Sequence, residues 1–317
     1  MSVCLGLDTS NYTTSAAIWQ DGAIHQVKRL LPVKPGELGL RQSDAVFHHV
    51  RQLPDIVEEL RGLCDAPITA IAASDRPQQR EGSYMPCFLA GMGAARELAA
   101  VLHVPCYRFT HQQGHVAAAL FGAERTAWIR EPFLAFHVSG GTTDALLVQP
   151  DKEDILRCET VGRSRDLKAG QLIDRVGGLL GLPFPAGPAL EKLASRAPGW
   201  GSAGRLPRPS LEGADCHLSG VENQCRTMKE KGAPDEEVAL FCLRSVLAAV
   251  SGMTQALLRV YGNLPVVYAG GVMSNSLLRR ELEAAYNGTF APPAYSADNA
   301  AGIALLCSLR EKGAGRL

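Results

Sequence analysis

The chain repeats one local pattern, in which a short apolar strand is followed by a turn of small residues and a second strand. The segments 13–18 (TTSAAI) and 142–147 (TTDALL) begin 129 residues apart, and each follows such a strand and turn. Apolar, β-branched runs bounded by turn residues are typical of β-hairpins. A hairpin that recurs at this spacing in 317 residues predicts a duplicated α/β domain. Six residues are also few enough for a chance similarity. Whether the repeat reflects a duplicated domain therefore depends on the motifs described below.

Hydrophobic periodicity predicts an alternation of strands and helices along the whole chain. We expect an N-terminal lobe over 1–125 and a C-terminal lobe over 126–317, and Pro54 predicts a kink or a break in the first long helix. His48 and His49 are expected on the solvated face of that helix. Its apolar face is expected at Val46, Val50, Leu53, Ile56, Val57 and Leu60. The predicted strands are 3–8, 13–19, 23–29, 68–73, 105–109, 133–139, 142–148 and 265–269, and the predicted helices are 43–64, 89–102, 111–121, 170–180, 188–195, 235–261 and 275–286, with a loop and helix over 296–309 and a loop over 201–215.

Composition narrows the functional classes. The 32 Lys and Arg balance the 32 Asp and Glu, which argues against a chain that grips nucleic acid through bulk charge alone. The first residues lack a basic, apolar leader, and no run of about 18 apolar residues predicts a membrane span. Nine scattered cysteines without a CxxC pair suggest a reducing, cytoplasmic setting in which most thiols are buried.

Two histidines mark a candidate metal site. His111 and His115 stand four residues apart in a predicted helix, so both imidazoles lie on one face and can share a cation. A third ligand must come from elsewhere, and Asp298 before the last helix is a candidate. The same spacing also suits two surface or capping histidines, and Asp298 can simply cap its helix. Asp8, which ends the first strand before Thr9 and Ser10, is either a turn former or a carboxylate for a hydrated cation.

Glycine pairs after strands mark candidate anion sites. Glycine numbers 32 in the chain, and paired glycines allow backbone to approach a ligand closely. Ser139-Gly140-Gly141-Thr142 can form a nest of N–H groups and hydroxyls, although a tight hairpin turn needs the same residues. Gly270-Gly271 followed by Asn275 at a helix start can cradle a phosphate or ribose. Gly177-Gly178 is expected only to permit close helix packing.

Taken together and in this order, these motifs resemble the TsaD family of tRNA N6-adenosine threonylcarbamoyltransferases, once called O-sialoglycoprotein endopeptidases or glycoproteases. The resemblance runs from about residue 3 to residue 309. Its matching segments are 5–10 (LGLDTS), 111–115 (HQQGH), 138–141 (VSGG), 169–170, 174–175, 179–182, 187–194 (GPALEKLA), 219–220, 269–272 with Asn275, and 298–301 (DNAA). It implies an α/β, duplicated, two-lobed actin/hexokinase-like ATPase fold with its ligand in an interlobe cleft.

The resemblance also assigns roles. It implies one divalent metal ion, iron or zinc, held by His111, His115 and Asp298, with Asp8 a catalytic candidate by position only. The ligand would be ATP or threonylcarbamoyl-adenylate, and the acceptor N6 of a tRNA adenosine. TsaB-like partner proteins would supply the activated substrate and much of the grip on tRNA, in a homo- or heterodimer. The implied ligand-binding residues are Val138, Ser139, Gly140, Gly141, Thr142, Asp174, Gly187, Gly270, Gly271 and Asn275.

Several positions depart from the family pattern. Thr142 replaces the histidine of SGGHT, while Leu167 and Gln171 replace the second Asp and the Glu of DDAAGE. The segment 76–83 (RPQQREGS) replaces a glycine-rich GPGL loop. These changes fit a divergent paralogue and leave two alternatives: a non-catalytic nucleotide- and metal-binding scaffold, or a carbamoyltransferase or kinase for a small molecule. A protease is the weakest interpretation, since HxxGH lacks the adjacent Glu that would activate water.

Overall fold

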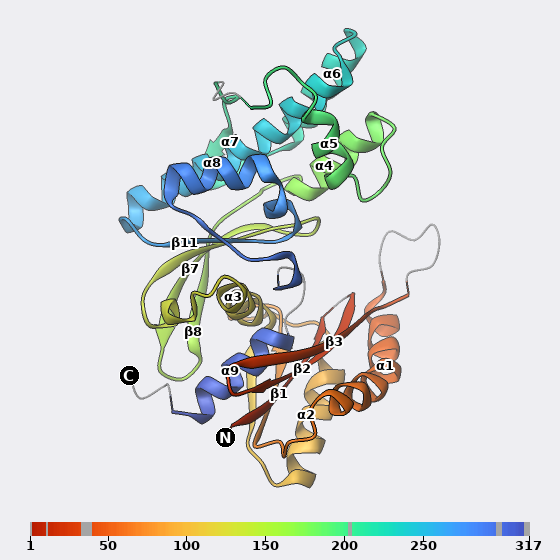
Figure 1. The fold of residues 1–317 in the computed structure, drawn as a ribbon, viewed down its shortest axis with the longest axis vertical. Helices are drawn as coiled ribbons and strands as arrows, with labels where there is room; N and C mark the ends of the chain where they lie inside the picture. Colours follow the sequence, from red (N-terminus) through yellow and green to blue (C-terminus); the bar gives the residue numbers. More distant parts are fainter. Residues whose placement is uncertain (1, 11, 33–39, 202–204, 296–299, 314–317) are drawn as a thin grey trace. The chain divides into compact units, whose positions relative to one another are not determined.

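The fold was analysed in a computed structural model of the full chain (Figure 1). The structure describes residues 2–10, 12–32, 40–201, 205–295 and 300–313. These residues form two compact units, of which unit 1 comprises 1–131, 149–158 and 294–317, and unit 2 comprises 132–148 and 159–293. Each unit is built around its own five-stranded sheet.

Unit 1 has a mixed sheet in the order β3-β2-β1-β4-β5. The first three strands are antiparallel neighbours, whereas β4 and β5 run parallel to β1. The strands are β1 (Val3–Ser10), β2 (Thr13–Gln20), β3 (Ala23–Leu30), β4 (Ala70–Arg76) and β5 (Cys106–Thr110). The helices are α1 (Gln42–Leu63), α2 (Phe88–Leu102), α3 (His111–Gly122), the short η1 (Thr126–Arg130) and α9 (Ala300–Glu311).

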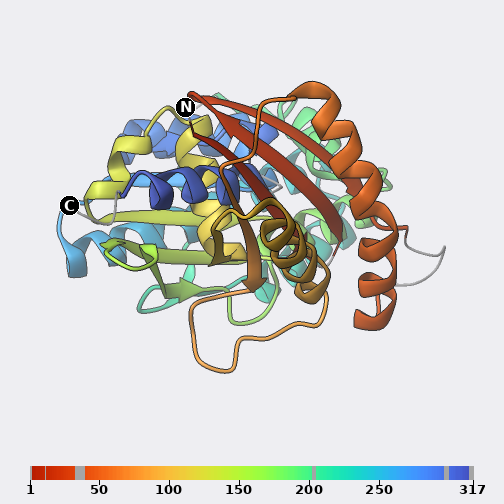
Figure 2. The same cartoon turned by 90° about the horizontal axis from the view of Figure 1, so that it is seen from below.

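The two faces of this sheet are covered by different helices (Figures 1 and 2). The side chains of Leu5 and Leu7 join a core with α1 and α2. Alternate residues of a strand face opposite sides, so Gly6 faces α9, where an added Cβ would lie 2.4 Å from the backbone nitrogen of Ala304. Ala17 on β2 packs against the alanines of α9 in the same way. Small residues therefore let the last helix lie directly on the first strands.

Unit 2 repeats this topology, since its sheet has the order β12-β11-β6-β7-β8. A meander supplies β6, β7 and β8, and β11 and β12 then add in parallel beside β6. The strands are β6 (Phe133–Val138), β7 (Thr143–Asp151), β8 (Ile155–Arg163), β11 (Val266–Ala269), β12 (Thr289–Phe290) and the separate pair β9 (Ser210–Glu212) and β10 (Asp215–His217). The helices are α4 (Ala169–Leu179), α5 (Gly187–Ala194), α6 (Ser219–Glu230), α7 (Asp235–Tyr261), α8 (Ser276–Tyr286) and the short η2 (Gly271–Ser274) and η3 (Pro293–Tyr295).

The matching strand orders confirm the duplication that the repeated hairpin suggested. Thr13 opens β2, and Thr143, one residue later than its predicted counterpart, opens β7. The units are not the contiguous segments 1–125 and 126–317, however. Unit 1 also includes 149–158 and the C-terminal helix α9, because α9 packs on β1, β2 and β4. Sequence order alone gives no sign of this return of the chain to its first unit.

Helix α1 corrects the expected position of His49. Pro54 lies inside one continuous helix from Gln42 to Leu63, so the helix does not break there. The buried face is Ala45, His49, Leu53, Ile56 and Leu60, whereas Val50 is 57% exposed. The expectation that His49 lies on a solvated face was therefore wrong: its side chain is fully buried, with its ring Nδ1 2.8 Å from Thr14 Oγ1. His49 therefore shares the buried face of α1 with these apolar residues and has a polar partner on β2.

Helix α7 is the one helix in the described ranges that is long and apolar enough to cross a membrane. Most of its apolar stretch is buried, and fourteen of its residues, from Val238 to Leu257, face the interior. It forms the spine of the unit 2 core. All nine cysteines are free thiols, and eight of them are buried, with Cys106 exposed.

Candidate functional site

The first cluster of polar groups lies where β1, β4 and β5 of unit 1 end. Asp8 is 2% exposed, and its two carboxylate oxygens are both engaged. His111 Nδ1 lies 2.8 Å from one oxygen, and Ser74 Oγ donates to the other at 2.5 Å. Parallel strands bring their carboxyl ends to one edge of a sheet, which explains why residues 8, 74 and 111 meet. Ser74 was not singled out from the sequence.

The charge state of Asp8 follows from this pairing. Burial on its own would raise the pKa of the Asp8 carboxyl, but the His111 imidazole and the hydrogen bonds from His111 and Ser74 outweigh burial, so the pKa is lowered. An ionised Asp8 accepts a hydrogen bond from His111 Nδ1–H. The other ring nitrogen, Nε2, then carries the lone pair that a metal ion requires.

His111 and His115 share one face of α3, as their spacing predicted. Their ring centroids are 4.5 Å apart, and the ring planes are nearly perpendicular. The helix begins with a capping box in which Thr110 and Gln113 exchange hydrogen bonds. Asp298, the expected third ligand, lies outside the described residues. Within the described ranges, no group of three or more His, Cys, Asp or Glu side chains is placed to hold a metal ion.

The predicted anion loop of unit 2 joins β6 to β7. Ser139 N donates to Thr142 O at 2.8 Å, and Thr142 N donates to Ser139 Oγ at 3.2 Å. The start of α4 packs directly behind the loop, because Gly170 N donates to Ser139 O and a Cβ on Gly170 would lie 2.6 Å from Gly140 Cα. A Cβ on Gly140 or Gly141 would meet nothing within 4 Å. The packing therefore requires Gly170, while the Gly140–Gly141 backbone faces open space.

In the second glycine pair, Gly270-Gly271, packing within unit 2 explains the first glycine. Gly270 has φ +100°, and a Cβ there would lie 2.2 Å from Val138 O at the end of β6. The close approach of β11 to β6 thus explains Gly270, whereas a Cβ on Gly271 would meet nothing within 4 Å. Asn275 caps α8, its Oδ1 accepting from Leu277 N and Leu278 N at 3.1 Å.

Hydrogen bonds connect the remaining predicted residues of unit 2. Asp174 Oδ1 accepts from Ala186 N at 2.8 Å, which fixes the start of α5 at Gly187. Farther along α5, Glu191 Oε1 accepts from Ser276 N at 2.9 Å, beside Asn275. Helix α4 in turn contacts η2 and α5. Val138 to Thr142 and Gly270 to Asn275 thus lie at or just after the ends of β6 and β11, and hydrogen bonds and helix contacts link Asp174 and Gly187 to this region.

Gln171, which departs from the family pattern, and Asp166, which precedes the departing Leu167, both have structural roles. Gln171 Oε1 accepts from Lys168 N and so caps α4. Asp166 accepts from the backbone of Leu167 and from both the backbone and the hydroxyl of Ser219. Although burial opposes this, these hydrogen bonds lower the pKa of Asp166 to about 2. Its carboxylate joins α4 to the start of α6.

His49 gives a testable pH dependence. Burial lowers the pKa of its imidazole from 6.5 to about 4, and among the described residues its Nε2 has no hydrogen-bond partner. Between these pH values the unfolded chain binds a proton that the folded chain excludes. The free energy of unfolding should thus fall by about 3 kcal/mol as the pH is lowered from 6.5 to 4.

Urea unfolding at several pH values measures this slope. We expect His49→Gln to flatten it, while His48→Gln, on the neighbouring half-buried position, retains it. Equal slopes in both variants would show that His49 is not the group responsible.

Comparisons with known proteins show the family to which the chain is similar. Residues 36–305 match the model of the family described as TsaD: tRNA N6-adenosine threonylcarbamoyltransferase. Curated relatives of that name include one from Thermus thermophilus, 31% identical over 95% of this chain and 90% of the relative. Another, from Methanopyrus kandleri, is 27% identical over 95% of this chain and 86% of the relative.

Solved structures resemble the fold. Component A of the (R)-2-hydroxyglutaryl-CoA dehydratase of Acidaminococcus fermentans superposes with a TM-score of 0.55 at 17% identity, covering 99% of this chain and 100% of that one. A ROK hexokinase from Thermus thermophilus gives 0.52 at 16% identity, covering 98% and 99%. HypF from T. kodakarensis gives 0.60 at 13% identity, covering 98% of this chain and 48% of that one. The expected duplicated actin/hexokinase-like fold is confirmed.

Proposed function

The chain belongs to the TsaD family, and on that premise we propose that it transfers a threonylcarbamoyl group from an adenylate to N6 of an adenosine in tRNA. The observation that carries the proposal is the near end-to-end match to the family together with the intact Asp8–His111–His115 arrangement. If the transferred group is not threonylcarbamoyl, the simplest alternative is a carbamoyl group. The reaction forms an N–C bond at the carbonyl carbon and breaks its bond to the adenylate oxygen. AMP leaves, and the amine proton passes to solvent.

Unit 2 would bind the adenylate. The Ser139–Thr142 loop offers backbone N–H groups with open space before Gly140 and Gly141, which suits a phosphate. Asp174 and Gly187 would bind the ribose side. Since the Asn275 oxygen already caps α8, its NH2 group is the part that would reach the ligand.

Unit 1 would hold the metal ion. Two imidazoles on one helix face, one of them oriented by a buried carboxylate, match the donors that zinc and iron prefer. His111 and His115 would supply two ligands, and Asp298 the third. A divalent ion held there would supply Lewis-acid chemistry.

Asp8 would act through His111 rather than as the general base. Both of its oxygens already accept hydrogen bonds, and its side chain is buried. We therefore assign it to holding the His111 ring in the tautomer that presents Nε2.

The departures from the family pattern support a second candidate, a nucleotide- and metal-binding scaffold without turnover. Gln171 is committed to a helix cap, and Thr142 occupies the place of a family histidine. The two candidates share all binding steps and differ only in product formation.

Partners and location follow from the family proposal. With no net charge, the chain would share its grip on tRNA with a TsaB-like partner protein. We place this assembly in the cytoplasm, where tRNA and the reduced thiols are found.

The test supplies the purified protein with threonylcarbamoyl-adenylate carrying a 13C carbonyl and offers unmodified tRNA, free adenosine or free amines as acceptors. We expect 13C-labelled threonylcarbamoyladenosine in nucleosides from the tRNA sample alone. Label in a small acceptor instead would favour the small-molecule transferase. Binding of the adenylate without product, in the presence of the partner protein, would favour the scaffold.

A further inference from the structure

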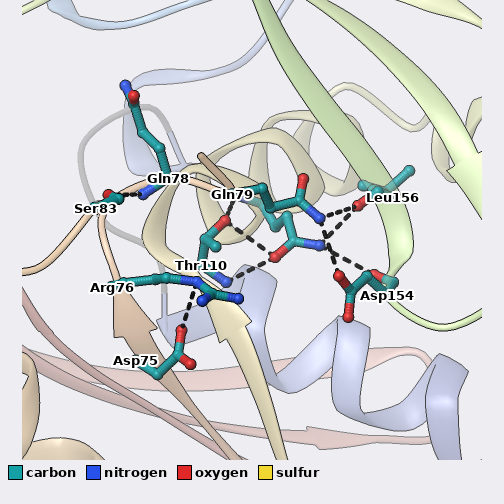
Figure 3. A network of polar contacts seen from close by, with 9 residues as sticks. Asp75, Arg76, Gln78, Gln79, Ser83, Thr110, Asp154 and Leu156 are labelled. Carbon is teal, nitrogen blue, oxygen red and sulfur yellow. Dashed lines mark hydrogen bonds and ion pairs between the residues drawn. The ribbon is translucent and has the colours of Figure 1, made fainter. Parts of the chain in front are cut away.

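Two glutamine side chains, Gln79 and Gln113, converge on the backbone carbonyl of Leu156 beside the start of α3. Figure 3 labels Gln79 and Leu156 in this network. Gln113 Nε2 donates to Leu156 O at 2.7 Å, and Gln79 Nε2 donates to the same oxygen at 3.1 Å. A carbonyl oxygen has two lone pairs, so these two amides satisfy it completely. Gln79 belongs to the segment 76–83, which replaces the glycine-rich loop of the family.

Gln113 fixes the start of α3. It stands between His111 and His115 and is 1% exposed. Its Oε1 accepts from Thr110 N at 2.7 Å, while its Nε2 also reaches Asp154 O at 3.1 Å. These contacts with the turn and strand at 154–156 therefore restrain the rotation of α3 about its axis. That rotation decides where the two imidazoles point.

Gln79 holds the same strand from the other side. Its Oε1 accepts from Cys158 N at 2.7 Å, and its Nε2 also contacts Asp154 Oδ2 at 3.2 Å. Leu156 O and Cys158 N lie two residues apart on β8, the last strand of its sheet, so the amide pairs with this edge as a neighbouring strand would. The loop backbone adds a contact, because Pro77 O accepts from Gln112 N at 3.0 Å.

From this geometry we infer that Gln79 is a positioning residue for the metal-binding face of α3. Gln79 holds the carbonyl that orients Gln113, and Gln113 orients the helix that carries His111 and His115. The inference rests on the metal site of the proposed function. The segment that departs most from the family pattern would therefore support its most characteristic motif.

The test uses Gln79→Glu, which keeps the side-chain length but cannot donate to Leu156 O. We expect Co2+ to bind the variant about tenfold more weakly than the unaltered protein, in the range found when groups behind metal ligands are lost. The added negative charge would by itself strengthen cation binding, so weaker binding reports lost positioning. The visible absorption of bound Co2+ should change, and the α3 amides of the metal-free protein should exchange faster.

Gln78→Glu is the matched control, because the neighbouring side chain points away from the network in Figure 3 and adds the same charge. Equal Co2+ affinity, absorption and α3 exchange in the two variants would overturn the inference. If the Glu variant does not fold, Gln79→Met removes the same hydrogen bonds without charge and should behave likewise. If the unaltered protein fails to bind Co2+, the proposed metal site itself is contradicted, and the inference falls with it.

Discussion

Replacing His111 by Ala should lower the affinity for Co2+ by about a hundredfold or more, since losing groups that merely support a ligand already costs 10–100-fold. His111 is the ring that Asp8 orients, at 2.8 Å, so its loss removes one donor and leaves a buried carboxylate without that partner. Isothermal titration of the metal-free protein measures the change. Product formation from the adenylate should fall with it.

The control is His48→Ala, which removes a half-buried histidine from α1. It should bind Co2+ as the unaltered protein does. Similar affinities in His111→Ala and the unaltered protein would remove α3 as the metal-binding element, whatever the transferase result.

Gly302→Ala should destabilise the protein by about 3 kcal/mol, at the upper end of what overpacking costs. A Cβ at this position of α9 would lie 1.9 Å from Gly114 O, the glycine of the HxxGH motif. The atom that the new methyl group would meet belongs to the backbone of α3, so α3 and α9 must move apart. Because α3 carries His111 and His115, we expect weaker Co2+ binding as well as a lower free energy of unfolding in urea.

Gly178→Ala provides the comparison, since this helical glycine of α4 has nothing within 4 Å of an added Cβ. It should gain up to about 1 kcal/mol from helix propensity. Equal effects of the two substitutions would mean that α3 and α9 do not pack as closely as described.

The sequence was most informative where local pattern and final environment agree. The histidine spacing placed both rings on one face of α3, and the repeated hairpin predicted the duplicated sheets. It was misleading where contacts with residues distant in sequence decide whether a side chain is buried or where a helix packs. Thr14 draws His49 into the core, and α9 returns to the first sheet, neither of which periodicity can indicate.

The glycines show the same limit in the candidate site. Both pairs, 140–141 and 270–271, were expected to face a ligand. Gly270 is instead required by its contact with Val138, and Gly170, predicted only through the family resemblance, provides the close approach behind the loop. Ser74 lacked any sequence signal, because its role depends on which strand ends the fold brings together. Gln79 and Gln113 lie in segments that the sequence singled out, and Thr110 and Gln113 have the spacing of a capping box, but their shared contact with Leu156 depends on the fold.

The chain is proposed to carry out metal-dependent transfer to tRNA. The most direct test is single-turnover formation of threonylcarbamoyladenosine by chelator-treated protein, with its partner, before and after a divalent metal is restored. We predict negligible product from the stripped protein, recovery on adding the metal, and no recovery in His111→Ala. Product that forms equally without metal, or none from loaded protein that binds the adenylate and tRNA, would contradict the claim.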